Sequence, residues 1–176
     1  MINVCNIHNI YTYPGCLFPT IPNILQIAVK EAREYIDTYF ARFPGVKKHT
    51  EETIESAREL GYVQTMLGRR RYIPEIASAN RNIRQFAERA AVNMPIQGSA
   101  ADIMKLAMIR IAPMLKSTSG KLLLQVHDEL VLEVSPQDAQ AIAQIVREGM
   151  EQAYKLLVPV KVDVKIGKNW SEMEGI

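Results

Sequence analysis

Two adjacent carboxylates, Asp128 and Glu129, interrupt an otherwise apolar run, LLLQVHDELVLEV, at residues 122–134. An unpaired carboxylate is costly inside a core strand, so the interruption predicts a β-hairpin with the acids at or near its bend. Carboxylates exposed at such a bend can bind hard divalent cations, and phosphoryl transfer uses two such ions to hold the attacking and leaving oxygens. Asp128 is therefore a candidate metal ligand, whereas Glu129 would point the other way along the strand.

An ordinary interpretation of the same residues stays open. Asp and Glu are common in turns, and a solvated hairpin tip needs no metal. The neighbouring His127 alone is more often a surface or core histidine than a ligand.

A basic stretch lies between residues 68 and 90, where six arginines face only Glu75 and Glu88, so the local charge is about +4. Its densest part is GRRRY, which contains Arg69 and Arg70 beside a predicted turn. Arginine pairs bidentately with phosphate oxygens, and a duplex backbone is the usual large polyanion. The alternative is a solvated face whose arginines pair with nearby glutamates.

A polar edge continues from the basic stretch, because Arg89, Asn93 and Gln97 recur every four residues. This spacing places them along one edge of a helix or of a gently kinked pair of helices. Their side chains could bond to a minor groove, where shape matters more than base sequence. A polar helix face in water explains the same spacing.

The elements that must position these residues follow from hydrophobic periodicity and helix-ending residues. We expect helices over residues 29–43 and on to about Leu60, then a hairpin turning near Leu67 and Gly68. A helix over residues 82–92 should end near Pro95 or give way there to another that runs to about Leu115. The hairpin at 122–134, a helix starting at Ser135 and a strand over residues 158–167 follow. Residues 1–22 have no evident period and read as irregular chain.

Composition bounds the class of protein. The chain has 176 residues, 48% hydrophobic and 23% charged, with a formal net charge of +2. These values are typical of a globular protein with a working core. Cys5 and Cys16 lack metal-ligand spacing, and no stretch reaches membrane-spanning length. We expect no membrane partner and a cytoplasmic location.

Four segments together resemble the C-terminal part of the family A DNA polymerases, the bacterial DNA polymerase I group. They are GYVQTMLGRRRYIPEI, ERAAVNMPIQGSAADIMKLAM, LLLQVHDELVLEV and VPVKVDVKIGKNW, in the same order and spacing. The resemblance runs from about Asn23 to Trp170, and QVHDELVLE is similar to the family's motif C. It implies an α+β fold: an antiparallel palm sheet, made of the motif C hairpin and the C-terminal strand, packed on helices and preceded by a helical remnant of the fingers. The implied domains are an unassigned segment (1–22), a distal fingers-like region with a hairpin (23–92) and a palm-like subdomain (93–176).

The resemblance also implies residue roles. Asp128 matches the metal-binding catalytic aspartate, Glu129 its acidic neighbour, and His127 a histidine near the primer terminus. The other implied DNA contacts are Arg69, Arg70, Arg89, Asn93, Gln97 and Gln125. The implied function is template-directed nucleotidyl transfer in DNA replication or repair. The implied partners are two Mg²⁺ ions, a primer–template duplex and deoxynucleoside triphosphates, which suggests association with the nucleoid.

Two features of the family are missing from this sequence: a motif like DYSQIELR, which carries the other catalytic aspartate on an earlier strand, and the fingers helix that grips the triphosphate. We therefore expect only part of the two-ion site and little activity from the chain alone, unless a second chain carries the missing segment. We also expect an unpaired sheet edge beside the motif C hairpin. Two alternatives remain, a duplex DNA-binding module without chemistry and a protein–protein interaction module whose acids and arginines are ordinary surface.

Overall fold

The computed structural model describes the backbone of residues 2–7 and the whole of residues 27–176. These residues form two compact units. One joins the first strand to residues 100–176, and the other, described from residue 27, extends to Ser99. No helix in this described part is both long and apolar enough to cross a membrane.

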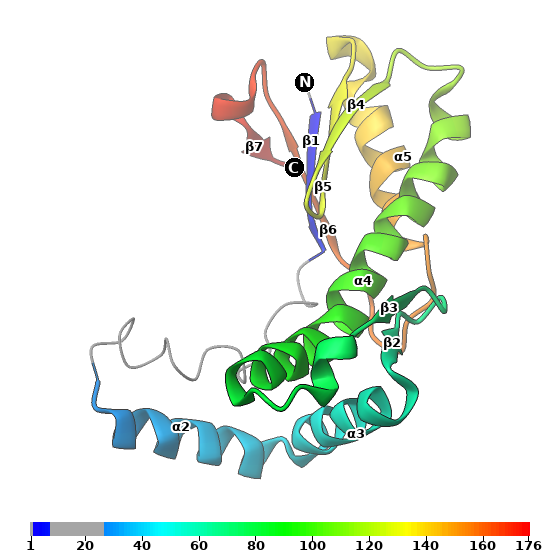
Figure 1. The fold of residues 1–176 in the computed structure, drawn as a ribbon. Helices are drawn as coiled ribbons and strands as arrows, with labels where there is room; N and C mark the ends of the chain where they lie inside the picture. The colour runs from blue at the N-terminus through cyan, green and yellow to red at the C-terminus, as the bar shows by residue number, and fades with distance from the viewer. Residues whose placement is uncertain (1, 8–26) are drawn as a thin grey trace. The chain divides into compact units, whose positions relative to one another are not determined.

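The first unit is built on a five-stranded sheet in the order β4-β5-β1-β6-β7 (Figure 1). The strands are β1 (Ile2–Ile7), β4 (Lys121–Val126), β5 (Glu129–Glu133), β6 (Val162–Ile166) and β7 (Glu174–Gly175). Every neighbouring pair is antiparallel. The expected α+β fold, with a hairpin and a C-terminal strand in one antiparallel sheet, is confirmed.

Strand β1 corrects two expectations. Residues 2–7 were expected to be irregular, yet they form the central strand, pairing Asn3 with Val131 of β5 and with Lys165 of β6. We also expected an unpaired sheet edge beside the hairpin, and this prediction was wrong for β5, because β1 pairs with it. The two edges of this sheet are β4 and β7. The prediction for residues 8–22, the rest of that segment, lies outside the residues that the structure describes.

The core of the first unit lies between the sheet and two helices. The C-terminal part of α4 (Arg81–Leu115) and α5 (Ala139–Glu151) supply buried residues such as Met104, Ile111 and Val146. The sheet supplies Leu130 and Leu132 of β5 and the alternating Val162 and Val164 of β6. A short 3₁₀ helix, η3 (Pro136–Asp138), leads from the hairpin into α5, and η4 (Trp170–Glu172) precedes β7.

The second unit is helical apart from one small ribbon. It contains α2 (Val29–Arg42), α3 (Pro44–Leu60), the ribbon β2–β3 (Tyr62–Gln64 and Arg70–Tyr72), the 3₁₀ helix η2 (Pro74–Ala77) and the N-terminal part of α4 (Figure 1). Gly61 ends α3 with φ 76°, a left-handed conformation that glycine adopts without strain. The core is formed by Ala57, Val63, Ile73, Ile76, Ala87, Ala91 and Met94.

Helix α4 is continuous through Pro95, so the sequence-based boundary there was wrong. Proline lacks the N–H that would bond back one turn, which normally ends or kinks a helix. Here Ala91, Val92 and Met94 before the proline, and Ser99 and Ala100 after it, are buried. Tertiary packing on both sides of the proline therefore overrides the local preference.

Replacing Gly149 by alanine tests how closely α5 packs on α4. A Cβ atom at Gly149 would lie 2.6 Å from Cγ1 of the buried Ile111. Overpacking costs about 1–3 kcal/mol, whereas alanine normally stabilises a helix by about 1 kcal/mol relative to glycine. We expect Gly149→Ala to lower the free energy of unfolding measured by urea denaturation.

The matched control is Gly45→Ala in α3, where an added Cβ would meet no described atom within 4 Å. This control should leave the free energy of unfolding unchanged or raise it slightly. Equal effects of the two substitutions would show that the two helices are less tightly packed than described.

Candidate active site and nucleic-acid interface

The Asp128 hairpin turns through two residues. Strands β4 and β5 pair as far as Val126 and Glu129, which leaves only His127 and Asp128 in the turn. His127 has φ 53°, a left-handed conformation that is uncommon in residues other than glycine, although asparagine, aspartate and histidine adopt it more often than the rest. Such outliers concentrate at functional sites, where surrounding structure holds them in place.

The turn is braced by Gln125. Its Nε2 donates a 2.8 Å hydrogen bond to the backbone oxygen of His127. This bond fixes the carbonyl that precedes Asp128 and so restricts the turn. Gln125, predicted from the resemblance to contact DNA, thus uses one donor of its amide within the hairpin.

Asp128 is half-buried, and its carboxylate forms no hydrogen bond or ion pair with any residue that the structure describes. Its oxygens therefore suit a hard divalent cation, which takes carboxylate ligands and completes its coordination with water and phosphate. Glu129, also half-buried, is already engaged in an interaction within the protein. No group of three or more His, Cys, Asp or Glu side chains among the described residues could hold a metal ion. These residues fit one part of a metal site and do not complete one.

The tip is anchored by β5. Leu130, Val131 and Leu132 are all buried, although alternate residues of a strand point to opposite faces. The start of the strand is therefore held from both faces of the sheet. The partner strand β4 is the exposed edge, with Leu122, Leu123 and Leu124 each partly open to solvent.

In the second unit, the β2–β3 ribbon is fastened to α4 by its turn. Nη2 of Arg69 donates to the backbone oxygen of Gly98 at 3.0 Å. The backbone N–H of Met66 donates to Oγ of the buried Ser99 at 2.9 Å. Gly98 permits this approach, because an added Cβ would lie 2.7 Å from Cγ2 of Thr65. Arg69, predicted to contact phosphate, thus has a structural role in holding the turn.

Arg70 lies on the outer side of the ribbon. Its guanidinium carbon is 4.6 Å from the ring centroid of Tyr62, within the range of a cation–π contact. Stacking uses the flat face of the guanidinium and leaves its N–H edges able to bond to a phosphate.

The predicted polar edge of α4 is present. Arg89 and Asn93 are half-buried and Gln97 is exposed, at the four-residue spacing that places them along one edge of the helix. The guanidinium of Arg89 lies 5.9 Å from the ring of the exposed Phe86, and Asn93 makes an interaction within the protein. The site residues predicted from sequence thus form two groups: the hairpin tip in the first unit, and β3 with α4 in the second.

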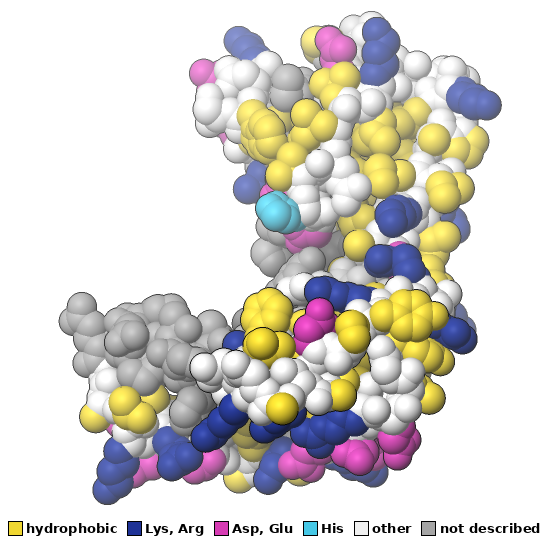
Figure 2. All heavy atoms as spheres, in the orientation of Figure 1, with side chains coloured by type: hydrophobic (Ala, Val, Ile, Leu, Met, Phe, Trp, Pro, Cys, Tyr) yellow, Lys and Arg dark blue, Asp and Glu magenta, His cyan; other side chains and the backbone are white. Residues whose placement is uncertain are grey.

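Elsewhere in the second unit the charges are paired locally. Lys48 lies 3.7 Å from Glu52, and Arg58 lies 2.8 Å from Glu88. The hydrogen bond to Glu88 is the largest cause that raises the pKa of Arg58. Figure 2 shows basic and acidic side chains interleaved along α2 and α3. Exposed pairs of this kind contribute little stability, and they make this surface a poor site for a polyanion.

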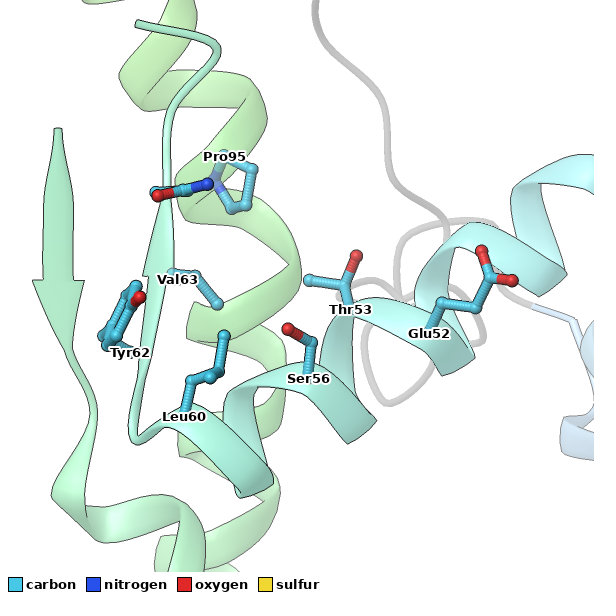
Figure 3. A pocket seen from close by; sticks show the side chains of 8 residues that line it. Glu52, Thr53, Ser56, Leu60, Tyr62, Val63 and Pro95 are labelled. Carbon is cyan, nitrogen blue, oxygen red and sulfur yellow. The ribbon is translucent and has the colours of Figure 1, made fainter. Parts of the chain in front are cut away.

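A cavity of about 240 Å³ lies between α3, β2 and α4 (Figure 3). Glu52, Thr53 and Ser56 line it from α3, and Pro95 lines it from α4. Its other lining residues are Leu60, Tyr62, Val63 and Gln64. The cavity is smaller than the roughly 300–1,000 Å³ of sites for drug-sized ligands, so it suits a group the size of a single ring.

Comparison with known proteins places the chain in a family. The family model of DNA polymerase family A matches residues 15–172. The thermostable DNA polymerase I of Thermus filiformis is 51% identical over 148 residues, which cover 84% of this chain and 18% of that protein. The DNA polymerase I of Bacillus caldotenax is 52% identical over 148 residues, covering 83% of this chain and 17% of that protein.

A solved structure agrees with the sequence matches. It is the POL domain of Pol1 from M. smegmatis in complex with DNA primer-template and dNTP, with a TM-score of 0.82 and 46% identity. The match covers 87% of this chain and 27% of that one. The mixed fold and the extended match define a polymerase-type α+β protein. The chain belongs to DNA polymerase family A, and it spans less than a fifth of the length of the relatives named above.

Three features of the structure were not predicted from the sequence. Gly98 and Ser99, which hold the ribbon, were given no role, although the small residues of QGSA are a signal of close approach. The contact between the rings of Tyr62 and Tyr72, whose centroids lie 5.7 Å apart, depends on the register of the ribbon. Strand β1 was also not predicted, although the alternation of Ile2, Asn3 and Val4 is a short strand signal.

Replacing Ser99 by alanine tests the attachment of the ribbon to α4. The substitution removes the part-buried hydrogen bond from the Met66 N–H to the Ser99 hydroxyl, and such a bond contributes about 0.5–1.5 kcal/mol net. We expect Ser99→Ala to lower the free energy of unfolding by this amount in urea denaturation. The exposed Ser56→Ala in α3 is the control and should be neutral, since alanine favours a helix. If both variants unfold at the same urea concentration, the Ser99 contact does not hold the ribbon.

Proposed function

We propose that this chain forms the motif C part of a DNA polymerase active site, with Asp128 as the ligand of a divalent cation. The observation that carries the proposal is a half-buried carboxylate with no partner among the described residues, at the tip of a braced two-residue turn. Membership of DNA polymerase family A supports the choice of reaction. A structural carboxylate in this position would normally have an ion-pair or hydrogen-bond partner.

The proposed cation is Mg²⁺, in a two-ion site of which this chain supplies a part. A bound divalent ion would neutralise charge that develops on the attacking and leaving oxygens during nucleotidyl transfer. Asp128 would hold the ion, and Glu129 would contribute negative charge beside it. The Gln125 bond to the turn would keep the Asp128 backbone fixed, so that less reorganisation is needed when the ion binds.

We further propose that the chain alone does not polymerise DNA at a useful rate. A two-ion site needs carboxylates from more than one element of the protein. The strands that flank β5 are β4 and β1, and neither KLLLQV nor INVCNI contains an acidic residue. A second carboxylate strand beside β5 would therefore have to come from elsewhere and take the position of β1.

Primer–template duplex and deoxynucleoside triphosphate are the proposed substrates of the complete site, and the similar M. smegmatis domain is described in complex with both. The proposed duplex contacts are His127 at the hairpin and Arg70, Arg89, Asn93 and Gln97 in the second unit. The guanidinium of Arg69 and the amide of Gln125 already bond within the protein. We therefore propose that these two residues contribute less to DNA binding than the others. Such a protein would act at the nucleoid.

A chimera tests the proposed role of Asp128. In it, residues 23–170 of this chain replace the segment that they match in the DNA polymerase I of Bacillus caldotenax. We expect Mg²⁺-dependent primer extension, because the relative supplies the remaining strands and the triphosphate site. Asp128→Ala in the chimera should reduce the extension rate by about a thousandfold or more, in line with the loss of a central electrostatic contact.

Glu133→Ala provides the matched control, since it removes an exposed carboxylate at the opposite end of β5. It should leave extension unchanged. The 176-residue chain by itself should give no extension. Extension by this chain alone, or an Asp128→Ala chimera as active as the Glu133→Ala one, would contradict the proposal.

The second candidate is a duplex-binding module without chemistry. The observation in its favour is that the described residues contain no complete metal-binding group, while arginines lie on β3 and α4. It would be preferred if the chimera were folded and bound primer–template duplex but extended no primer.

A further inference from the structure

The outer face of the β2–β3 ribbon carries two aromatic rings and a stacked cation. Tyr62 pairs directly with Tyr72, and Gln64 pairs with Arg70. Because alternate strand residues share a face, these four side chains lie together, whereas Val63 and Arg71 belong to the other face. Val63 is buried in the core of the second unit, so the face with the tyrosines is turned outward.

Of the two tyrosine rings on this face, the ring of Tyr72 is open to a ligand. Arg70 covers the ring of Tyr62 at 4.6 Å, and the rings of Tyr62 and Tyr72 meet nearly edge to face, with centroids 5.7 Å apart at 61°. The contacts therefore occupy a face of Tyr62 and an edge of the Tyr pair. Tyr72 remains 69% exposed. Exposed Met66 and Leu67 at the turn extend the apolar surface, and Figure 2 shows hydrophobic and basic side chains side by side over this ribbon.

We infer that this face, formed by Tyr62, Gln64, Arg70 and Tyr72, binds an unpaired nucleotide of a single-stranded nucleic acid. An exposed aromatic ring next to a cation is the combination with which proteins hold single strands: the base stacks on the ring, and the charge attracts the backbone. Arg70 is oriented for the second task, because its stacked plane leaves the N–H edges able to bond to phosphate. This inference goes beyond the proposed duplex contacts and concerns a different ligand.

The neighbouring cavity fits the same ligand. Tyr62 and Gln64 belong both to this face and to the cavity lining, so the cavity borders this face. The cavity is lined by Thr53 and Ser56, whose hydroxyls can bond to the N–H and carbonyl groups of an unpaired base, and by Glu52, whose carboxylate lies 3.7 Å from Nζ of Lys48. The base side of a bound strand would therefore face the cavity, and its phosphates would lie toward Arg70.

The test is a fluorescence anisotropy titration of the whole chain with labelled 12-nucleotide oligonucleotides. The probes are oligo-dT, a strand of the same length with abasic positions, and a duplex. The abasic strand keeps the phosphates and removes the bases, so wild-type protein should bind oligo-dT about tenfold more tightly than the abasic strand. Equal affinity for the two would overturn the inference without needing any variant.

Variants then locate the stacking surface. Tyr72→Ala should weaken oligo-dT binding about tenfold and leave abasic and duplex binding unchanged, and Tyr72→Phe should bind like the wild type because it keeps the ring. Arg71→Ala, on the other face of the ribbon, should weaken oligo-dT and abasic binding equally, because only a charge is lost. The inference is overturned if Tyr72→Ala binds oligo-dT as the wild type does, or if it loses affinity equally for the abasic strand. Failure of duplex binding alone would count against the proposed function and not against this site.

Discussion

Strand β5 lies between β4 and β1, and its burial on both faces is the constraint on which the Asp128 turn depends. Leu130, Val131 and Leu132 follow the turn directly, and each is at most 2% exposed. Burying such side chains contributes roughly 1.5–3 kcal/mol each, whereas a left-handed residue such as His127 costs about 1–3 kcal/mol. The burial of the strand therefore outweighs the strain next to it, and Asp128 can be held at a fixed place without a partner among the residues that the structure describes.

In the second unit, the β2–β3 ribbon is held in place by contacts of its turn and not by burial on both faces. The β2–β3 ribbon is too short to be stable alone, and only one of its faces reaches a core. Contacts of its turn with Gly98 and Ser99 of α4 compensate. Because Arg69 makes this attachment, Arg70 and Tyr72 on the outer face of the ribbon are able to contact a ligand. The arginine stretch thus contains members that bond to backbone oxygens, such as Arg69 and Arg84, and members such as Arg70 that stay on the outer surface, a division that charge alone does not indicate.

The sequence allowed the prediction of elements with strong local signals. The Asp128 hairpin, the turn at Gly68 and the end of α3 at Gly61 were predicted correctly, because each depends on period or on one special residue. The alternation also predicted strand β6, which covers residues 162–166 of the expected 158–167. Pro95 misled the prediction, since the packing of Ala91 and Met94 that keeps α4 continuous comes from residues distant in sequence. Strand β1 was missed because six residues with two asparagines gain their strand character only between β5 and β6. The metal and DNA roles came from the family resemblance and remain predictions, since spacing alone also fits a solvated turn and a polar helix face.

The central claim is that this chain completes the sheet around the Asp128 hairpin with its own strand β1, which brings no second carboxylate. Hydrogen exchange of backbone amides tests it most directly, because an amide bonded within a central strand exchanges only when the sheet opens. The account predicts that amides of residues 3–5 exchange as slowly as those of Leu130 and Leu132. Exchange of residues 3–5 at the rate of an unstructured peptide, with β5 still protected, would contradict it and would leave the side of β5 opposite β4 open to a strand from another source.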